Sequence, residues 1–238
     1  MPSSNRYKRI MIKISGEALA GSAKTGIDST IVKKLADEIK TVSQAGFEIA
    51  LVIGGGNIFR GGTGEALGVE RTTGDHMGML ATVINALAMH SALSNSGVDS
   101  CVMTSIEMNS IAEPYTIRNA KRSLTEKKVV LMAAGTGNPF FTTDTAACLR
   151  AAEIKADLVI KATKVSGVYD KDPEKHSDAV KFDQISFLDV LHKQLKVMDL
   201  TAISLCMENN LPIMVFNLFE DNSIMRALKG ENVGTIIQ

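Results

Sequence analysis

The sequence is short of cysteine, of net charge and of long apolar runs, and each shortage excludes a class of protein. Its three cysteines are scattered and form no CxxC pair, which excludes a disulfide framework. The 26 basic residues balance the 26 acidic residues, so non-specific binding to nucleic acid has no support from the charge of the whole chain. No stretch approaches the roughly 18 apolar residues of a membrane span, and the first residues lack the apolar core of a signal peptide. We therefore expect a cytoplasmic protein that binds neither nucleic acid nor membrane.

The signature motifs of several enzyme classes are absent as well. No GxxxxGK[ST] phosphate loop occurs, and no glycine-rich turn reads GxGxxG, which argues against a nicotinamide dehydrogenase. There is no GxSxG elbow, which argues against an α/β-hydrolase. The four histidines lie far apart and show no zinc spacing. What remains is a set of strand ends that offer backbone N–H groups, each with one or two isolated charges.

Short apolar segments alternate with amphipathic segments along the chain. The apolar segments predict strands over residues 10–14, 49–53, 101–103, 129–132, 158–160, 213–216 and 235–237. Helical spacing predicts helices over 28–46, 75–97, 117–125, 187–193 and 200–209, and another that starts near residue 144. This alternation is typical of an α/β protein built as a three-layer αβα sandwich around a mostly parallel sheet. We predict a single domain over residues 1–238, with a disordered tail at 1–6.

The long helical segment after Gly74 has two apolar faces. The main stripe, which we expect to face the core, consists of Met77, Leu80, Ile84, Leu87 and Leu93. A second apolar face consists of Met79, Ala81, Val83, Ala86 and Met89. We interpret this second face as an interface between subunits, because an apolar face outside the core needs a partner.

The stretch from Ala133 to Ala147 is the most informative in the chain. A buried strand runs into it and an alanine-rich helix runs out of it, with two glycines, a proline and several hydroxyl and amide groups between them. Thr142, Thr143 or Asp144 could each cap the helix, so that its first N–H groups and positive dipole end face the loop. Such a joint suits an anionic ligand at the carboxyl edge of a parallel sheet. The alternative is an ordinary strand–turn–helix joint with a good cap.

Two other strand ends combine a cation with glycines. Lys13 lies inside an apolar strand, two residues before Ser15-Gly16, where it is either functional or an edge residue that reaches for solvent. Gly54-Gly55-Gly56 lets the main chain approach a ligand closely, and Arg60 can fork onto phosphate oxygens. Three consecutive glycines after a buried strand favour a binding loop over a mere turn.

Asp75, Asp144 and Asp199 each stand at a predicted helix start, where capping is the alternative to a role in a site. Glycine loops, cations and several carboxylates together suit phosphoryl transfer, in which a protein mostly positions two nucleotides and neutralises charge. If the acceptor is itself a phosphate, no general base is required, because the second pKa of a phosphate monoester is about 6. A kinase could therefore work without a well-placed histidine.

These motifs occur in one known family, in the same order and at about the same spacing. The chain resembles the bacterial uridylate (UMP) kinases, which belong to the amino-acid kinase family, from residue 7 to residue 238. The motifs that carry the resemblance are 13–19 (KISGEAL), 54–61 (GGGNIFRG), 74–79 (GDHMGM), 135–147 (GTGNPFFTTDTAA), 161–169 (KATKVSGVY) and 196–200 (KVMDL). The GTGNPFFTTD segment separates uridylate kinases from the carbamate and acetylglutamate kinases of the same fold.

The resemblance implies that ATP reversibly gives its γ-phosphoryl group to UMP, forming ADP and UDP for the supply of UTP and CTP. The implied catalytic residues are Lys13, Arg60, Asp144 and Asp199. The resemblance implies that ATP binds to Lys13, Ile14, Ser15, Gly16, Gly56, Arg60, Thr163, Tyr169 and Asp172. It implies that UMP binds to Gly55, Asp75, Thr136, Gly137, Asn138, Pro139, Phe140, Phe141, Thr142 and Thr143. Mg²⁺ would arrive with ATP, so no protein ligands for a metal are expected.

Assembly and regulation are implied by the same resemblance. The family is typically hexameric, and it is commonly activated by GTP and inhibited by UTP. Ser166 departs from the family pattern, which usually has aspartate at this place (KVDGVY), and the departure concerns a polar contact near the adenine side. The alternative from another class is a nucleotide-binding storage or regulatory protein without turnover. The intact set of implied catalytic residues argues against it.

Overall fold

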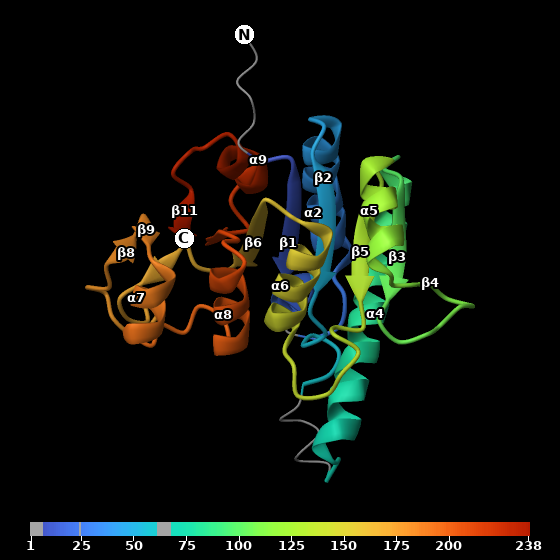
Figure 1. Ribbon diagram of the computed structural model, residues 1–238, viewed down its shortest axis with the longest axis horizontal. Coiled ribbons are helices and arrows are strands. Elements are labelled where there is room, and N and C mark those ends of the chain that lie inside the picture. The colour runs from blue at the N-terminus through green and yellow to red at the C-terminus, as the bar shows by residue number, and fades with distance from the viewer. Residues whose placement is uncertain (1–6, 24, 61–67) are drawn as a thin grey trace.

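A nine-stranded sheet forms the centre of the computed structural model, which describes residues 7–23, 25–60 and 68–238 (Figure 1). The strand order is β4-β3-β5-β2-β1-β6-β10-β11-β9. Neighbouring strands pair in parallel except β10 and β11, which are antiparallel. The predicted mostly parallel sheet is therefore confirmed. The predicted tail at residues 1–6 lies outside the described residues.

The longer strands lie where the apolar segments predict them. They are β1 (Arg9–Ile14), β2 (Glu48–Ile53), β3 (Ser100–Thr104), β5 (Val129–Ala133), β6 (Leu158–Thr163), β10 (Ile213–Asn217) and β11 (Gly234–Ile237). The sequence does not predict the two-residue strands, because two residues are too few to show a period. These are β4 (Glu113–Pro114) and β9 (Gln184–Ile185) in the main sheet, and the separate antiparallel pair β7 (Val168–Tyr169) and β8 (Lys181–Phe182).

Helices cover both faces of the sheet, which confirms the three-layer sandwich (Figure 1). α2 (Ser29–Gln44), α4 (Arg71–Asn95) and α9 (Ser223–Leu228) pack on one face, and α1 (Gly16–Leu19) follows β1 directly. α5 (Ile117–Thr125), α6 (Thr143–Ile154), α7 (Phe187–His192) and α8 (Leu200–Glu208) pack on the other face.

The alternation of β1 decides which layer each of its side chains enters. Ile10, Ile12 and Ile14 belong to the core under α2 and α4, whereas Met11 belongs to the core under α6. Successive strand residues point to opposite faces, so Lys13 projects on the same side as Met11, toward α6. A lysine within an apolar strand is thereby explained by its position beneath that helix.

The prediction for the long helix α4 is wrong in two respects. The helix begins at Arg71, after Glu70 at its N-cap position, so Asp75 lies one turn inside the helix and does not cap it. Three residues of the expected inward stripe are instead exposed, with relative exposures of 36% for Met77, 48% for Leu80 and 49% for Ile84, whereas Leu87 is half-buried against the core and Leu93 is buried in it. The residues of the second apolar face, which we interpreted as a subunit interface, are buried against the sheet: Met79, Ala81, Val83, Ala86 and Met89.

The reason for this reversal is close packing against a glycine. A Cβ placed on Gly55 would lie 2.7 Å from Cβ of Ala81 and 2.8 Å from the carbonyl oxygen of Gly78, so only a face with small residues can pack there. Both stripes are apolar, so periodicity alone could not choose between them.

α4 is also long and apolar enough to satisfy a length-and-composition criterion for a membrane span, with a window of mean hydropathy 1.3. Of that window, 44% is buried inside the protein. A helix in the core of a globular protein satisfies the same criterion, and α4 packs against α2, β3 and β5. The criterion is therefore weak evidence for a membrane segment.

Candidate active site

The carboxyl ends of four neighbouring strands bring the candidate loops together. β5, β2, β1 and β6 are adjacent in the sheet and run parallel, so the loops that follow them leave from one edge. These loops contain the start of the GTGNPFF stretch, the three glycines, the Ser15-Gly16 pair and the segment after Thr163. The edge that the sequence predicts as a ligand site is thus one continuous region.

Three charged side chains form the centre of this region. Asp144, in the first turn of α6, lies between two lysines: its Oδ1 is 2.6 Å from Nζ of Lys13 and its Oδ2 is 2.8 Å from Nζ of Lys161. The register of β1 and β6 pairs Lys13 directly with Lys161, so both lysines stand side by side. Their side chains and that of Asp144 are only 11–16% exposed.

The charges of this group are unequal, and the inequality suits an anionic ligand. Burial raises the pKa of Asp144, but the attraction of Lys13 and Lys161 outweighs it, so the pKa lies below its ordinary value and the carboxylate is ionised. Burial lowers the pKa of Lys161, and Asp144 offsets this only in part. With both lysines protonated, two positive charges face one negative charge in a mostly buried place. The remaining positive charge can be neutralised by a phosphate.

Asp199 fixes the turn that carries Asp144. It occupies the N-cap position of α8, but its side chain makes no capping hydrogen bond there. Instead, its carboxylate accepts hydrogen bonds from the hydroxyls of Thr142, at 2.6 Å, and Thr145, at 2.5 Å. Thr142 is the N-cap of α6, one of the three candidates from the sequence, and its hydroxyl accepts from the Thr145 N–H. Asp199 therefore does not contact the two lysines directly; it holds the first turn of α6, which carries Asp144.

Two buried side-chain amides hold the loop of three glycines in place. Asn57 and Asn85 exchange two hydrogen bonds, at 3.0 and 2.7 Å, and Asn85 of α4 also donates to the carbonyl oxygen of Gly54. Asn57 donates to the carbonyl oxygen of Gly26, which ties the segment before α2 to the same point. The glycine loop is consequently fixed to α4.

Arg60 lies apart from the two lysines. Its guanidinium contacts Glu17 at 2.6 Å and the carbonyl oxygen of Gly56 at 3.2 Å, and its side chain is 55% exposed. In this arrangement Arg60 contacts neither Asp144 nor Asp199. Its pairing with Glu17 gives it a partner that an incoming phosphate would have to replace.

A cleft of about 320 Å³ opens between α4 and the loop after β5; we call it the acceptor cleft. Of the residues that the sequence assigns to UMP, those that line it are Gly55, Asp75, Thr136, Phe141, Thr142 and Thr143. Gly137, Asn138, Pro139 and Phe140 belong to the same loop but do not line this cleft. Gly56 and Arg60, which the sequence assigns to ATP, do line it.

Asp75 links α4 to the loop after β5. Its carboxylate accepts hydrogen bonds from Nε of Arg71, at 2.9 and 3.0 Å, and from the backbone N–H of Phe140, at 2.8 Å. Two turns further along the same helix face, the hydroxyl of Thr82 accepts from the backbone N–H of Ala134. α4 therefore holds both ends of this loop.

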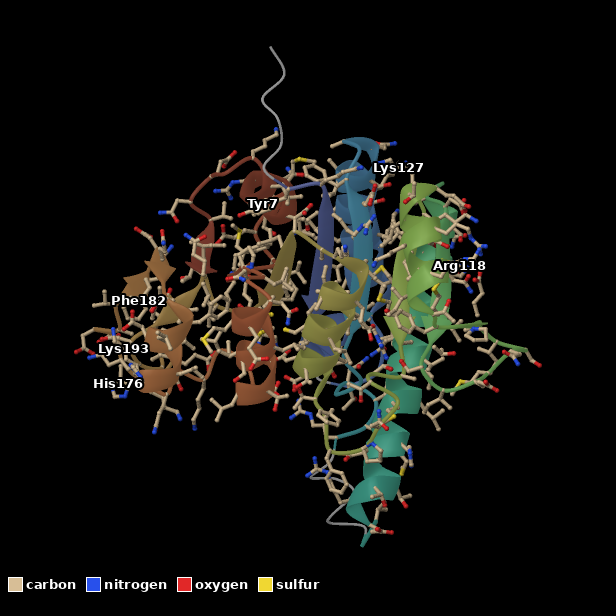
Figure 2. The ribbon with its side chains drawn as sticks, in the orientation of Figure 1. Tyr7, Arg118, Lys127, His176, Phe182 and Lys193 are labelled. Atoms are coloured by element: carbon tan, nitrogen blue, oxygen red, sulfur yellow. The ribbon has the colours of Figure 1, made fainter. Side chains whose placement is uncertain are left out.

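A larger cleft of about 520 Å³ lies beyond β6; we call it the donor cleft. It is lined by Thr163, Tyr169 and Asp172, all assigned to ATP by the sequence, and by Lys161. Lys193 also lines it, with its ammonium 5.1 Å from the centre of the Phe182 ring; Figure 2 labels both residues. Ile14, Ser15 and Gly16 line neither of the two clefts, and Ile14 is buried in the core.

Lys161 is the residue that sequence reasoning missed. Like Lys13, it is a lysine at the end of an apolar strand, and that similarity is the signal that could have revealed it. The signal becomes decisive only when the two strands are known to be neighbours in register.

A model of the amino acid kinase family matches residues 8–217 of the chain. This chain belongs to the amino acid kinase family. Among solved members of the family, a crystal structure of UMP kinase from Ureaplasma parvum is 38% identical with a TM-score of 0.93, and the alignment covers 98% of this chain and 99% of that one. A UMP kinase from Bacillus anthracis is 38% identical with a TM-score of 0.95, covering 98% and 96%. A uridylate kinase from Archaeoglobus fulgidus is 30% identical with a TM-score of 0.75, covering 96% and 99%.

Replacing Asp144 tests how far the two lysines depend on its charge. Asp144→Asn leaves two mostly buried ammonium groups without a counter-charge, so we expect the free energy of unfolding at pH 7 to fall by about 3–5 kcal/mol. Urea denaturation measures the change. Asp28→Asn serves as the control, because asparagine caps α2 about as well as aspartate does and this site lies outside the clefts.

The same loss should depend on pH in one direction. Because the folded pKa of Asp144 lies below its ordinary value of 3.8, its contribution is complete above about pH 4 and is lost as the pH falls through the folded pKa. The difference in stability between wild type and Asp144→Asn should thus stay constant from about pH 5 to 8 and shrink below about pH 4. A difference that acid leaves unchanged would contradict the ionised pairing.

Proposed function

We propose that this protein is a UMP kinase, which transfers the γ-phosphoryl group of ATP to UMP and forms ADP and UDP reversibly. The support is membership of the amino acid kinase family, together with 38% identity over nearly the whole chain to two UMP kinases. The site adds an independent argument from geometry. We also propose that the chain is one domain and that its product feeds UTP and CTP synthesis in the cytoplasm.

The observation that carries the proposal is the position of the Lys13–Asp144–Lys161 group between two clefts. Lys161 lines the donor cleft, and Thr143, the neighbour of Asp144, lines the acceptor cleft. Phosphoryl transfer requires two nucleotides whose phosphates meet at one place where charge is neutralised. We assign ATP to the donor cleft and UMP to the acceptor cleft, so that their phosphates meet at the lysines.

In this arrangement the protein positions the reactants and stabilises charge. The two ammonium groups face the negative charge that spreads over the transferred group, which is the largest contribution such a site can make. The phosphate of UMP is mostly ionised near neutral pH, because its second pKa is about 6, and it attacks without a general base. Asp144 keeps the two lysines apart from each other and in place, and Asp199 keeps the turn of Asp144 in place.

Mg²⁺ is proposed as part of the substrate, bound to the phosphates of ATP. Among the described residues, no group of three or more His, Cys, Asp or Glu side chains is placed to hold a metal ion. Both oxygens of Asp144 already face lysines. We propose, from the family resemblance, that the metal enters as MgATP.

The storage or regulatory alternative is not favoured. A protein that only binds a nucleotide needs one cleft, whereas this chain has two clefts beside the charged group: Lys161 lines one, and Thr143, next to Asp144, lines the other. The direct test is to incubate the protein with MgATP and each nucleoside monophosphate in turn. We expect ADP and UDP to appear with UMP; no nucleoside diphosphate product with any acceptor would contradict the proposal.

We further propose a homo-oligomer, a hexamer by family resemblance, with GTP as activator and UTP as inhibitor. Physical support comes from the exposed stripe of Met77, Leu80 and Ile84 on α4. Large apolar side chains one turn apart on a single helix face are typical of a contact surface. This stripe replaces the buried face that the sequence suggested as the interface.

The first prediction concerns the ammonium of Lys13. Lys13→Ala should lower kcat about 100- to 1000-fold, because removing one group that stabilises the transition state costs about 3–4 kcal/mol. UMP binding should weaken far less, and Asp144 keeps Lys161 as a partner, so the fold should survive. Steady-state kinetics compares it with Lys8→Ala, whose exposed side chain lies near the other end of β1. Near-wild-type turnover of Lys13→Ala would refute the assignment.

A second prediction decides which nucleotide occupies which cleft. Asp75→Asn removes a charged acceptor from the acceptor cleft, and a hydrogen bond to a charged group is worth about 1.5–3 kcal/mol, so the KM for UMP should rise roughly ten- to hundredfold. The KM for ATP should barely move. Arg71→Gln is the matched variant, since it removes the partner of Asp75 but keeps the carboxylate, and it should raise the KM for UMP less. A rise in the KM for ATP alone would show that the two sites are reversed.

A third prediction tests the stripe on α4. Ile84→Lys places a charge in the middle of the exposed stripe and should dissociate the oligomer, because burying an unpaired ammonium is unfavourable. Sedimentation velocity should show wild type well above the 25.5 kDa of one chain, and the variant shifted toward it. Lys33→Glu on the exposed side of α2 is the control. A monomeric wild type at micromolar concentration would refute the assembly.

A further inference from the structure

The loop that forms one wall of the acceptor cleft, residues 134–142, has an unusual backbone. Ala134 and Phe140 have φ of +62° and +72°, and the two glycines of the loop, Gly135 and Gly137, have φ of +59° and +83°. Non-glycine residues adopt such angles at a cost in free energy and keep them only where their surroundings fix them. Something outside the loop must therefore hold its shape.

α4 provides part of this support, at Ala134 and Phe140, as described above. The middle of the loop, between these two points, also contacts a different structure. That structure is a cluster around Arg150 of α6, which no role in the proposed reaction explains.

Arg150 is a buried guanidinium, only 6% exposed, with its donors directed at three partners. Its Nη1 donates to Glu153 at 2.8 Å, and its Nη2 donates to Oγ of Ser105 at 2.9 Å and to the carbonyl oxygen of Thr136 at 3.4 Å. The guanidinium also lies 4.1 Å from the centre of the Tyr115 ring. Among the described residues, no atom accepts from its Nε.

Ser105 lies between Arg150 and the loop. While its hydroxyl oxygen accepts from Arg150, its hydrogen is donated to the carbonyl oxygen of Gly135 at 2.9 Å. The loop passes directly over this serine, since a Cβ placed on Gly137 would lie 3.2 Å from Cβ of Ser105. Two successive carbonyls of the loop, those of Gly135 and Thr136, are thus held on the Arg150 side.

The orientation of these carbonyls fixes the orientation of the N–H groups. All described peptides are trans, so the N–H of Thr136 points away from the side to which the carbonyl of Gly135 points. Thr136 lines the acceptor cleft, and no described residue accepts a hydrogen bond from its N–H. The N–H of Gly137, by contrast, is used within the loop, where it donates to Ala134.

We propose that Arg150 is a positioning residue for the acceptor, which acts through Ser105 and the carbonyl of Thr136 to present the Thr136 N–H to an oxygen of the bound nucleoside monophosphate. The inference rests on the proposed function, because it assigns this cleft to UMP. Arg150 itself touches no substrate. Its effect is on the shape of the loop before UMP binds.

The competing interpretation is that the cluster only stabilises the fold. Tyr115 provides the means to separate the two. Its hydroxyl donates to Glu153 at 2.6 Å, a bond that involves no residue of the loop, and burial together with this carboxylate raises its pKa, so that it stays protonated. Tyr115→Phe removes that hydrogen bond but leaves Arg150, Ser105 and the loop in contact.

The experiment compares Ser105→Ala, Arg150→Lys and Tyr115→Phe with the wild-type protein. Ser105→Ala and Arg150→Lys should each raise the KM for UMP about tenfold, which is the loss of one well-placed hydrogen bond, while kcat and the KM for MgATP change less than about twofold. Ser105→Ala is the safer variant for folding, since it removes one oxygen. Tyr115→Phe should lower the melting temperature and leave the KM for UMP unchanged.

A second readout needs no activity. Hydrogen exchange of the amides of residues 136–140 in the ligand-free protein should be faster in Ser105→Ala and Arg150→Lys than in wild type or Tyr115→Phe. If neither variant changes the exchange or the KM for UMP, or if Tyr115→Phe changes both equally, the positioning role is refuted. If wild type phosphorylates no UMP, the proposed function fails, and the exchange data still decide whether Arg150 shapes the loop.

Discussion

A carboxylate between two lysines is the interaction on which the rest of this site depends. Parallel strands lie about 4.8 Å apart, so a register that pairs Lys13 with Lys161 brings two positive charges together in a mostly buried place. They would repel each other without Asp144, and Asp144 would be costly to bury without them. Each member therefore needs the others, and the group forms only when β1, β6 and α6 are all in place.

The position of Asp144 depends in turn on the residues that hold the first turn of α6. Thr142 caps the helix, Asp199 holds Thr142 and Thr145, and the loop before the cap forms a wall of the acceptor cleft. At the other end of the same short helix, Arg150 contacts the middle of that loop. One helix of three turns thereby connects the charged group, the residues that hold its first turn and the wall of the cleft. A single short segment of the sequence can for this reason determine much of the site.

Sequence patterns predict most of the sheet and the identity of its loops, because a buried parallel strand followed by glycine or a cap is recognisable over a few residues. The loops after β1, β2 and β5 all lie at one edge, as expected for parallel strands. The orientation of α4 is different: both of its faces are apolar, and the choice depends on how closely Ala81 can approach Gly55 in space. That distance has no local signature.

The site shows the same division between local and spatial information. Lys13 is recognisable as a lysine out of place in an apolar strand, whereas Lys161 becomes its partner only through the strand order β1–β6. Gly56 and Arg60, which the sequence assigned to ATP, follow the same strand as Gly55 and line the acceptor cleft with it. Their place too becomes clear only in the folded structure. The sequence also points to Asp75, but it does not predict that Asp75 lies inside α4 and accepts a hydrogen bond from Phe140. The helix begins at Arg71, and Glu70 before it makes no side-chain capping bond that would mark this start.

The two faces of α4 link the acceptor cleft to the surface of the protein. Its inner side holds the loops beside the acceptor cleft at three points, through Asp75, Thr82 and Asn85, and its outer side exposes Met77, Leu80 and Ile84. A helix is a stiff body, so a displacement imposed on one side is shared by the other. Anything that docks on the outer stripe and anything that fills the cleft therefore act on the same element. By thermodynamic reciprocity, each must alter the affinity of the other by the same factor whenever both bind one position of the helix more tightly than another.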